Sequence, residues 1–123
     1  MKKHTMKPVQ QEVELEIKQK LIPVVDTMEL LSGRWRIVIM TALYIGGTLR
    51  FNELKKHIPK ITGRSLSIDL KYLEQHEIVS RTIRDTSPIT VEYELTEYGR
   101  TLDSVFRALT EWGINHRKKI IGK

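Results

Sequence analysis

The stretch FNELKKHIPKITGRSLSIDLKYLEQHEI, residues 51–78, decides the fold of this 123-residue chain. Its first part predicts a short helix whose inward face is formed by Phe51, Leu54 and Ile58. Pro59 ends that helix, because the residue before a proline is disfavoured in the helical region. A second helix is predicted from Gly63 to about His76, with Thr62 as its cap and an inward face of Leu66, Leu70 and Leu73. Two short helices joined by a tight turn indicate a helix-turn-helix.

The side of the second helix that lies opposite its leucines is basic and rich in hydroxyl groups. In a helix-turn-helix the second helix enters the major groove of DNA, with its N-terminal residues nearest the base edges. The candidates for base contact are Arg64, Ser65, Ser67 and Ile68, which offer a guanidinium fork for guanine, hydroxyls, and an apolar surface for a thymine methyl. The candidates for phosphate contact are Lys60, Thr62 and Lys71, together with the backbone N–H at Gly63. A solvated polar face is the competing interpretation for any one of these residues.

The segments before and after residues 51–78 predict a helix and a β-hairpin, which extend the helix-turn-helix to a larger motif. A core helix is predicted from about Arg34 to Ile45, followed by a Gly-Gly stop and a short extended piece at 49–51. The runs IVSRTIR (78–84) and TVEYELT (90–96) alternate and are rich in β-branched residues, which predicts an antiparallel hairpin. In a winged helix-turn-helix this hairpin, the wing, touches the DNA backbone or the minor groove. Arg81 and Arg84 are its candidate contacts, and the helix before the turn adds backbone candidates at Arg50, Lys55 and Lys56.

Both ends of the chain carry apolar stripes of their own. One helix is predicted at about 9–21, another from Pro23 with Val24, Met28 and Leu31 inward, and a final one at 97–120 after a cap at Thr96. Pairing of the terminal stripes with those of a second subunit would bury them in a twofold dimer. The predicted interface consists of Val9, Val13, Ile17, Leu21, Val105, Leu109, Trp112, His116 and Ile120. Packing of one terminus on the other within one chain is the alternative.

The predicted fold class is therefore α+β and mostly α: a winged helix-turn-helix with added N- and C-terminal dimerisation helices. Residues 1–123 are expected to form a single DNA-binding domain. Within it, about 9–21 would be the N-terminal dimerisation helix, 23–96 the winged-helix core and 97–120 the C-terminal dimerisation helix.

The charge distribution supports a polyanionic partner. The formal net charge is +6, and residues 34–84 carry all of it, with ten Lys and Arg against four Asp and Glu. Such asymmetry favours double-stranded DNA over a membrane surface. A basic surface that only confers solubility has the same composition, so charge by itself leaves that alternative open.

Several classes of function have little support. The chain has no cysteine, its four histidines are scattered, and it lacks the common catalytic and phosphate-loop motifs, so we expect neither an enzyme nor a metal or cofactor. The longest apolar run is too short to span a bilayer, and no signal region is evident, which makes a cytoplasmic location the expectation.

Three segments together resemble the HxlR-type bacterial transcriptional regulators, a winged helix-turn-helix family related to the MarR-like group. The resemblance covers about residues 22–113 and is carried by Gly33-x-Trp35, by Arg50-Phe51-x-Glu53-Leu54 and by Tyr93-x-Leu95-Thr96-x-x-Gly99. It implies a homodimer that binds DNA through the helix at 63–76 and the wing at 78–96, with dimerisation through the terminal helices.

The chain departs from the family pattern at one position. Many HxlR-type members have a cysteine just before the Pro-Val that opens the first core helix, and some sense electrophiles or oxidants with it, but here that residue is Ile22. Thiol sensing is therefore not carried over. An unidentified small-molecule effector between the terminal helices stays open, although no residue identifies it.

The sequence thus predicts a dimeric, sequence-specific transcriptional regulator that binds a pseudo-palindromic operator. The alternative is a winged-helix module whose basic face binds an acidic protein partner. An enzyme that holds a phosphorylated substrate on the basic patch is a weaker rival, because no nucleophile or general base is evident.

Overall fold

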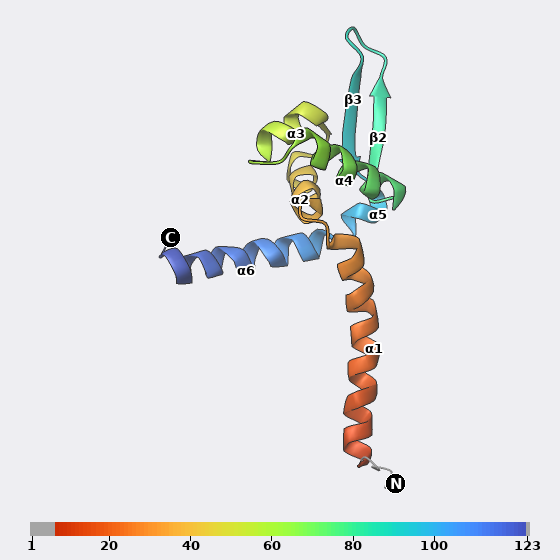
Figure 1. The fold of residues 1–123 in the computed structure, drawn as a ribbon, viewed down its shortest axis with the longest axis vertical. Helices are drawn as coiled ribbons and strands as arrows, with labels where there is room; N and C mark the ends of the chain where they lie inside the picture. The colour runs from red at the N-terminus through yellow and green to blue at the C-terminus, as the bar shows by residue number, and fades with distance from the viewer. Residues whose placement is uncertain (1–6, 123) are drawn as a thin grey trace. The chain divides into compact units, whose positions relative to one another are not determined.

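The computed structural model of the protein describes residues 7–122. The chain divides into two compact units at the Ser32–Gly33 bond, and each is described by itself. The first unit contains one helix, α1 (Pro8–Leu31). The second contains helices α2 to α6 and a small antiparallel sheet, as Figure 1 shows. No helix within residues 7–122 is long and apolar enough to cross a membrane.

Helix α1 runs through Pro23 without a break, so the prediction of separate helices at 9–21 and from Pro23 is wrong. A proline removes only one N–H from the helix, and α1 continues past it to Leu31. The apolar residues keep one face on both sides of the proline, at steps of three or four: Val9, Val13, Ile17, Leu21, Val24, Met28 and Leu31. Of the predicted inward residues, Leu31 is buried, whereas Val24 and Met28 are more than half exposed.

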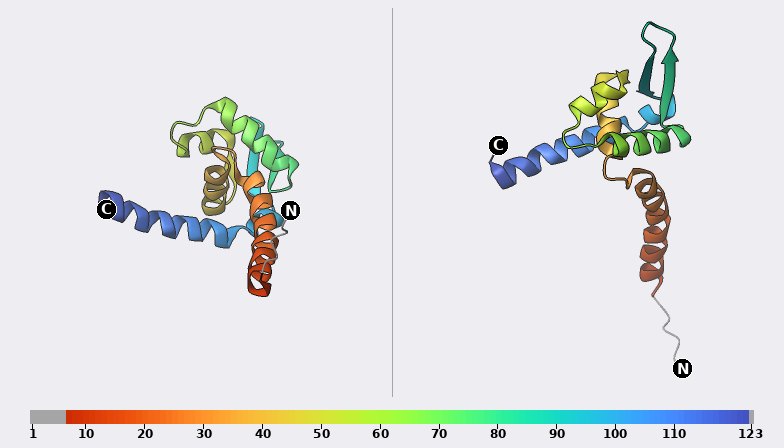
Figure 2. Two further views of the ribbon diagram at one scale, coloured as in Figure 1. Left: turned by 60° about the horizontal axis from the view of Figure 1, so that its bottom comes forward. Right: turned by 45° about the horizontal axis from the view of Figure 1, so that its top comes forward.

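The core of the second unit lies where α2 (Arg36–Gly46), α4 (Gly63–Gln75) and the sheet meet (Figure 2). Helix α2 is apolar on several sides and buries Ile39, Met40 and Leu43. The short helix α3 (Phe51–His57) adds Leu54. The predicted inward face of the next helix is confirmed, because Leu66, Leu70 and Leu73 are at most 1% exposed. This packing fixes which side of α4 faces solvent.

The predicted hairpin is confirmed as β2 (Val79–Arg84) and β3 (Thr90–Leu95). Its register pairs Val79 with Leu95 and Arg84 with Thr90. The short extended piece before α3 becomes a third strand, β1 (Leu49–Arg50), which pairs antiparallel with β3 and gives the order β1-β3-β2. The far end of the hairpin extends beyond the helices of its unit (Figure 1).

The prediction of one final helix at 97–120 is also wrong, since the segment forms α5 (Glu97–Arg100) and α6 (Asp103–Ile121). Thr96 caps α5 as predicted: its hydroxyl oxygen accepts from the Gly99 N–H at 2.9 Å, and its own N–H donates to the Ile78 carbonyl at 2.9 Å. Gly99 sits so close to that carbonyl that a Cβ atom would overlap it. After this contact, a tight turn at Thr101 and Leu102 changes the direction of the chain, and Phe106 in the following helix is buried in the core.

Candidate nucleic-acid interface

The turn between α3 and α4 presents the start of α4 to solvent. Thr62 caps the helix, with its hydroxyl oxygen accepting from the Ser65 N–H at 3.0 Å. Among residues 7–122, the N–H groups of Gly63 and Arg64 have no acceptor, as expected in the first turn of a helix. These free donors and the helix dipole make the site favourable for an anion.

The exposed side of α4 contains the residues that the sequence assigned to it. Arg64, Ser67, Ile68 and Lys71 are exposed, and Ser65 and Gly63 are half-buried. Ile68 is 55% exposed, although it is a large β-branched side chain for which burial is usual. The orientation of α4 therefore agrees with the prediction, while the contacts of these side chains with DNA stay a prediction.

Further cations surround the start of α4. Lys60 lies in the turn with a left-handed backbone, φ 69°, and its side chain is exposed. The ammonium of Lys55 lies beside Gly63, because a Cβ at that glycine would be 3.7 Å from Lys55 Nζ. Lys56 and Arg50 are exposed as well, and the Arg50 N–H donates to Glu53 Oε1 at 2.9 Å at the start of α3. These exposed cations thus come from the end of β1, from α3 and from the turn before α4.

One feature of α4 was missed by the sequence analysis. Asp69 is buried on the leucine side of the helix, and its Oδ1 lies 3.7 Å from Nε of Arg36 at the start of α2. The Arg36 guanidinium carbon also lies 3.3 Å from the centre of the Tyr72 ring, and that ring stacks on His76. An acid three residues after Leu66 on an apolar face is the signal that could have revealed the pair, since such a charge needs a partner.

The two arginines of the wing have different surroundings. Arg84 Nε lies 2.5 Å from Glu92 Oε1 across the hairpin. Arg81 is exposed and has no ion-pair partner among residues 7–122. Both arginines are candidate DNA contacts from the sequence. Of the two, only Arg81 has no carboxylate partner within residues 7–122.

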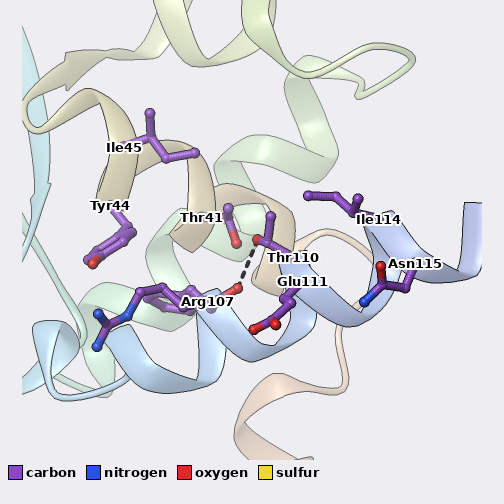
Figure 3. Close-up of a pocket in the computed structure, with 9 residues that line it drawn as sticks. Thr41, Tyr44, Ile45, Arg107, Thr110, Glu111, Ile114 and Asn115 are labelled. Carbon is purple, nitrogen blue, oxygen red and sulfur yellow. Dashed lines mark hydrogen bonds between the residues drawn. The ribbon is translucent and has the colours of Figure 1, made fainter. Parts of the chain in front are cut away.

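An apolar groove of about 390 Å³ lies between α2 and α6 (Figure 3). Its lining includes Tyr44 and Ile45 from α2, and Phe106, Thr110 and Ile114 from α6. The Thr110 hydroxyl donates to the Phe106 carbonyl at 2.8 Å, so its proton is already used within the helix. Ile45 is 78% exposed, so this end of the groove is open to solvent.

The predicted dimer residues are mostly exposed in the single chain. On α1 these are Val9, Val13, Ile17 and Leu21, each at least 50% exposed. On α6, Leu109, Trp112, His116 and Ile120 are exposed, and Val105 is half-buried. Trp112 and His116 stack on each other with ring centres 4.8 Å apart. Among the described residues of α6, only Phe106 is buried.

Comparison with known proteins gives one consistent answer. The model of the HxlR-like helix-turn-helix family matches residues 30–120. The uncharacterized HTH-type transcriptional regulator YdeP of Bacillus subtilis (strain 168) is 39% identical over 98 residues, 80% of this chain and 76% of YdeP. YtcD of the same organism, described in the same words, is 38% identical over 108 residues, which are 88% of this chain and 85% of YtcD.

A solved structure of the redox regulator HypR in its oxidized form is similar too. It superposes with a TM-score of 0.71 at 39% identity and covers 76% of this chain and 95% of that one. The redox function in that title is a statement about HypR. The present chain has no cysteine.

Proposed function

The chain belongs to the HxlR-like helix-turn-helix family and is a transcriptional regulator with a helix-turn-helix DNA-binding fold, and from this premise we propose that it binds a specific operator as a homodimer. In the proposed complex α4 lies in the major groove. Arg64, Ser65, Ser67 and Ile68 face the base edges. Lys60, Thr62, Gly63 and Lys71 contact phosphates on the two sides of the groove.

The observation that carries this proposal is the division of α4 into two faces. Three leucines and the Arg36–Asp69 pair hold one side against the core, which leaves little freedom for the helix to rotate. The other side presents a guanidinium, two serine hydroxyls, one of them half-buried, and an isoleucine, which are three kinds of group that can read base edges. A surface built only for solubility has no need of an exposed isoleucine within a basic face.

The cations around the turn support an orienting role for phosphate contacts. Lys55 and Lys60 flank the helix start, where the free N–H groups of Gly63 and Arg64 add partial positive charge, and Lys56 is exposed on the preceding helix. Phosphate contacts of this kind fix register and orientation but carry no sequence information. Binding should therefore be strongly salt-dependent, with log K falling by about 0.9 per neutralised phosphate for each unit of log salt.

The exposed stripes of α1 and α6 support the proposed homodimer. Stripes of large apolar side chains this long are usually covered in a soluble protein. Their burial in a twofold interface would give two copies of α4, and such dimers read half-sites about one helical turn apart, roughly 34–36 Å. The groove between α2 and α6 provides further apolar surface for the same assembly.

Selection of binding sites from random duplex DNA tests the proposal directly. We expect enrichment of one motif with inverted half-sites separated by about one helical turn. The molar mass from sedimentation should correspond to two protein chains, both for the free protein and for its complex with DNA. Failure to enrich any motif, together with equal affinity for scrambled DNA, would overturn the sequence-specific function, and an enriched motif without inverted symmetry would overturn the twofold mode.

A further inference from the structure

Helix α4 exposes one large apolar side chain. Among residues 51–75, all of which the structure describes, Ile68 is the only large hydrophobic residue that is exposed, at 55%. The leucines of the same helix are buried, so the core does not use Ile68. Single apolar residues are common on protein surfaces, and their position decides whether they serve a function.

The position of Ile68 is central on the outward face of α4. The buried leucines define the inward side, and Arg64, Ile68 and Lys71 follow one another on the opposite side at steps of four and three residues. Neither Arg64 nor Lys71 forms a salt bridge within residues 7–122. Residue 68 lies about 7.5 Å along the axis from Gly63, in the part of a recognition helix that faces base edges. An isoleucine thus separates two unpaired cations where bases would be read.

An isoleucine side chain recognises apolar groups only. It has neither donor nor acceptor, whereas the major-groove edges of adenine, guanine and cytosine consist of hydrogen-bonding groups. A hydrocarbon that covers such a group leaves it without a partner, which weakens binding. Thymine differs, because its C5-methyl group projects into the major groove. Ile68 therefore favours a pyrimidine with a methyl group at C5.

We propose that Ile68 selects a C5-methylated pyrimidine in the operator and accepts 5-methylcytosine in place of thymine, so that methylation of a cytosine at this position strengthens binding. This inference rests on the proposed function and extends it from the base sequence of the operator to its covalent state. 5-Methylcytosine has the C5-methyl group of thymine and differs from it in the neighbouring exocyclic group, an amino group in place of O4. Such a signal requires no cysteine, and this chain has none.

The two neighbouring cations predict an order among the pyrimidines. Arg64 and Lys71 can only donate hydrogen bonds, so either of them favours O4 of thymine over the amino group of a cytosine. Thymine should bind most tightly, 5-methylcytosine next and cytosine least. The methyl group itself should contribute about three- to fivefold both for thymine against uracil and for 5-methylcytosine against cytosine.

The experiment uses the full-length protein and the operator obtained by selection from random DNA. Each thymine of one half-site is replaced in turn by deoxyuridine, which removes only the methyl group. At one position we expect affinity to fall by about three- to fivefold. Replacement of that thymine·adenine pair by cytosine·guanine should weaken binding further, and 5-methylcytosine·guanine should then bind about three- to fivefold more tightly than cytosine·guanine.

Variants at position 68 assign the methyl effects to this side chain. Ile68→Ser should abolish both effects, and Ile68→Val should keep them because it stays apolar. Gln75→Ala, an exposed position on the same face two turns later, is the matched control and should leave both effects unchanged. Thermal unfolding should change little in all three variants, because both positions are exposed.

Three results would contradict the inference. Methyl effects that persist in Ile68→Ser show that another residue reads the methyl group, and a deoxyuridine scan without any loss shows that no methyl group is read. A thymine–uracil difference without a gain from 5-methylcytosine removes the response to cytosine methylation. Failure to select any operator overturns the proposed function as well, whereas a selected operator with a flat deoxyuridine scan counts against this inference alone.

Discussion

The helix-turn-helix and the wing lie side by side in one unit, and an arginine–acid pair involves each of them. For the helix-turn-helix the pair joins Asp69 of α4 to Arg36 of the neighbouring helix α2, with side chains 13% and 16% exposed. In the wing it is Arg84–Glu92, with side chains 59% and 23% exposed. The first pair lies behind α4 and leaves the cations of the outer surface free, while the second neutralises a cation on the surface itself. The two regions therefore expose different chemistry on their surfaces.

The largest expected effect comes from breaking the buried pair. Asp69→Ala leaves the Arg36 guanidinium without its carboxylate in a mostly buried place, and we expect a loss of about 2 to 3 kcal/mol in the free energy of unfolding. The Tyr72 ring still covers the guanidinium, which keeps the loss below that of a fully buried pair.

Urea denaturation of both pair variants measures this difference. Glu92→Ala is the matched change in the wing, and its cost should stay below about 1 kcal/mol because that pair is exposed. Equal losses for Asp69→Ala and Glu92→Ala would show that the buried position of the first pair contributes nothing extra to stability.

The second effect concerns base recognition by α4. Arg64→Ala should cost about 1 to 3 kcal/mol at one position of the operator and relax the choice of base there, because a guanidinium makes two hydrogen bonds to guanine. Competition gel shifts with single-base operator variants measure the change. A loss of the same size on every variant and on scrambled DNA would reassign Arg64 to phosphate contact.

The third effect separates affinity from stability at the turn. Lys60 has a backbone φ of 69°, where glycine is favoured, so Lys60→Gly removes the cation without adding steric strain. We expect all DNA sequences to bind more weakly and the salt slope to fall by about 0.9, with thermal stability unchanged or slightly raised. An unchanged salt slope would place Lys60 away from the phosphates.

The sequence predicted the helix-turn-helix better than it predicted the ends. Leu66, Leu70 and Leu73 repeat at helical spacing next to strong turn residues, so the local signals and the packing agree on α4. At Pro23 and at Thr101 they disagree. Pro23 predicted the start of a new helix, but the apolar face is uninterrupted there and α1 continues through it. The apolar stripe of the final segment predicted one continuous helix, but a turn follows the close contact between Gly99 and the Ile78 carbonyl.

For the candidate site, too, the sequence predicted what depends on one helix and did not predict how separate elements meet. Exposure of Arg64, Ser67 and Ile68 follows from periodicity, because it depends only on the helix to which they belong. The pairing of Asp69 with Arg36, 33 positions earlier, and of Arg84 with Glu92 depends on how elements meet in space. Charge counts along the sequence therefore did not reveal that Arg84 is paired with Glu92 or that Asp69 is paired with Arg36 behind α4, while the DNA contacts of the wing stay a prediction.

The smallest effect tests the wing pair itself. Arg84→Ala removes a cation that already faces Glu92, and it leaves that carboxylate unpaired on the wing, where it would repel any nearby phosphate. DNA affinity should fall slightly for this reason, and Arg84→Ala/Glu92→Ala should restore it, with the salt slope of the original protein. If Arg84 instead contacts a phosphate directly, the double variant stays weak and its slope stays lower by about 0.9, because the lost contact is not replaced. The comparison of the single and double variants thus decides whether Arg84 only pairs with Glu92 or also contacts a DNA phosphate.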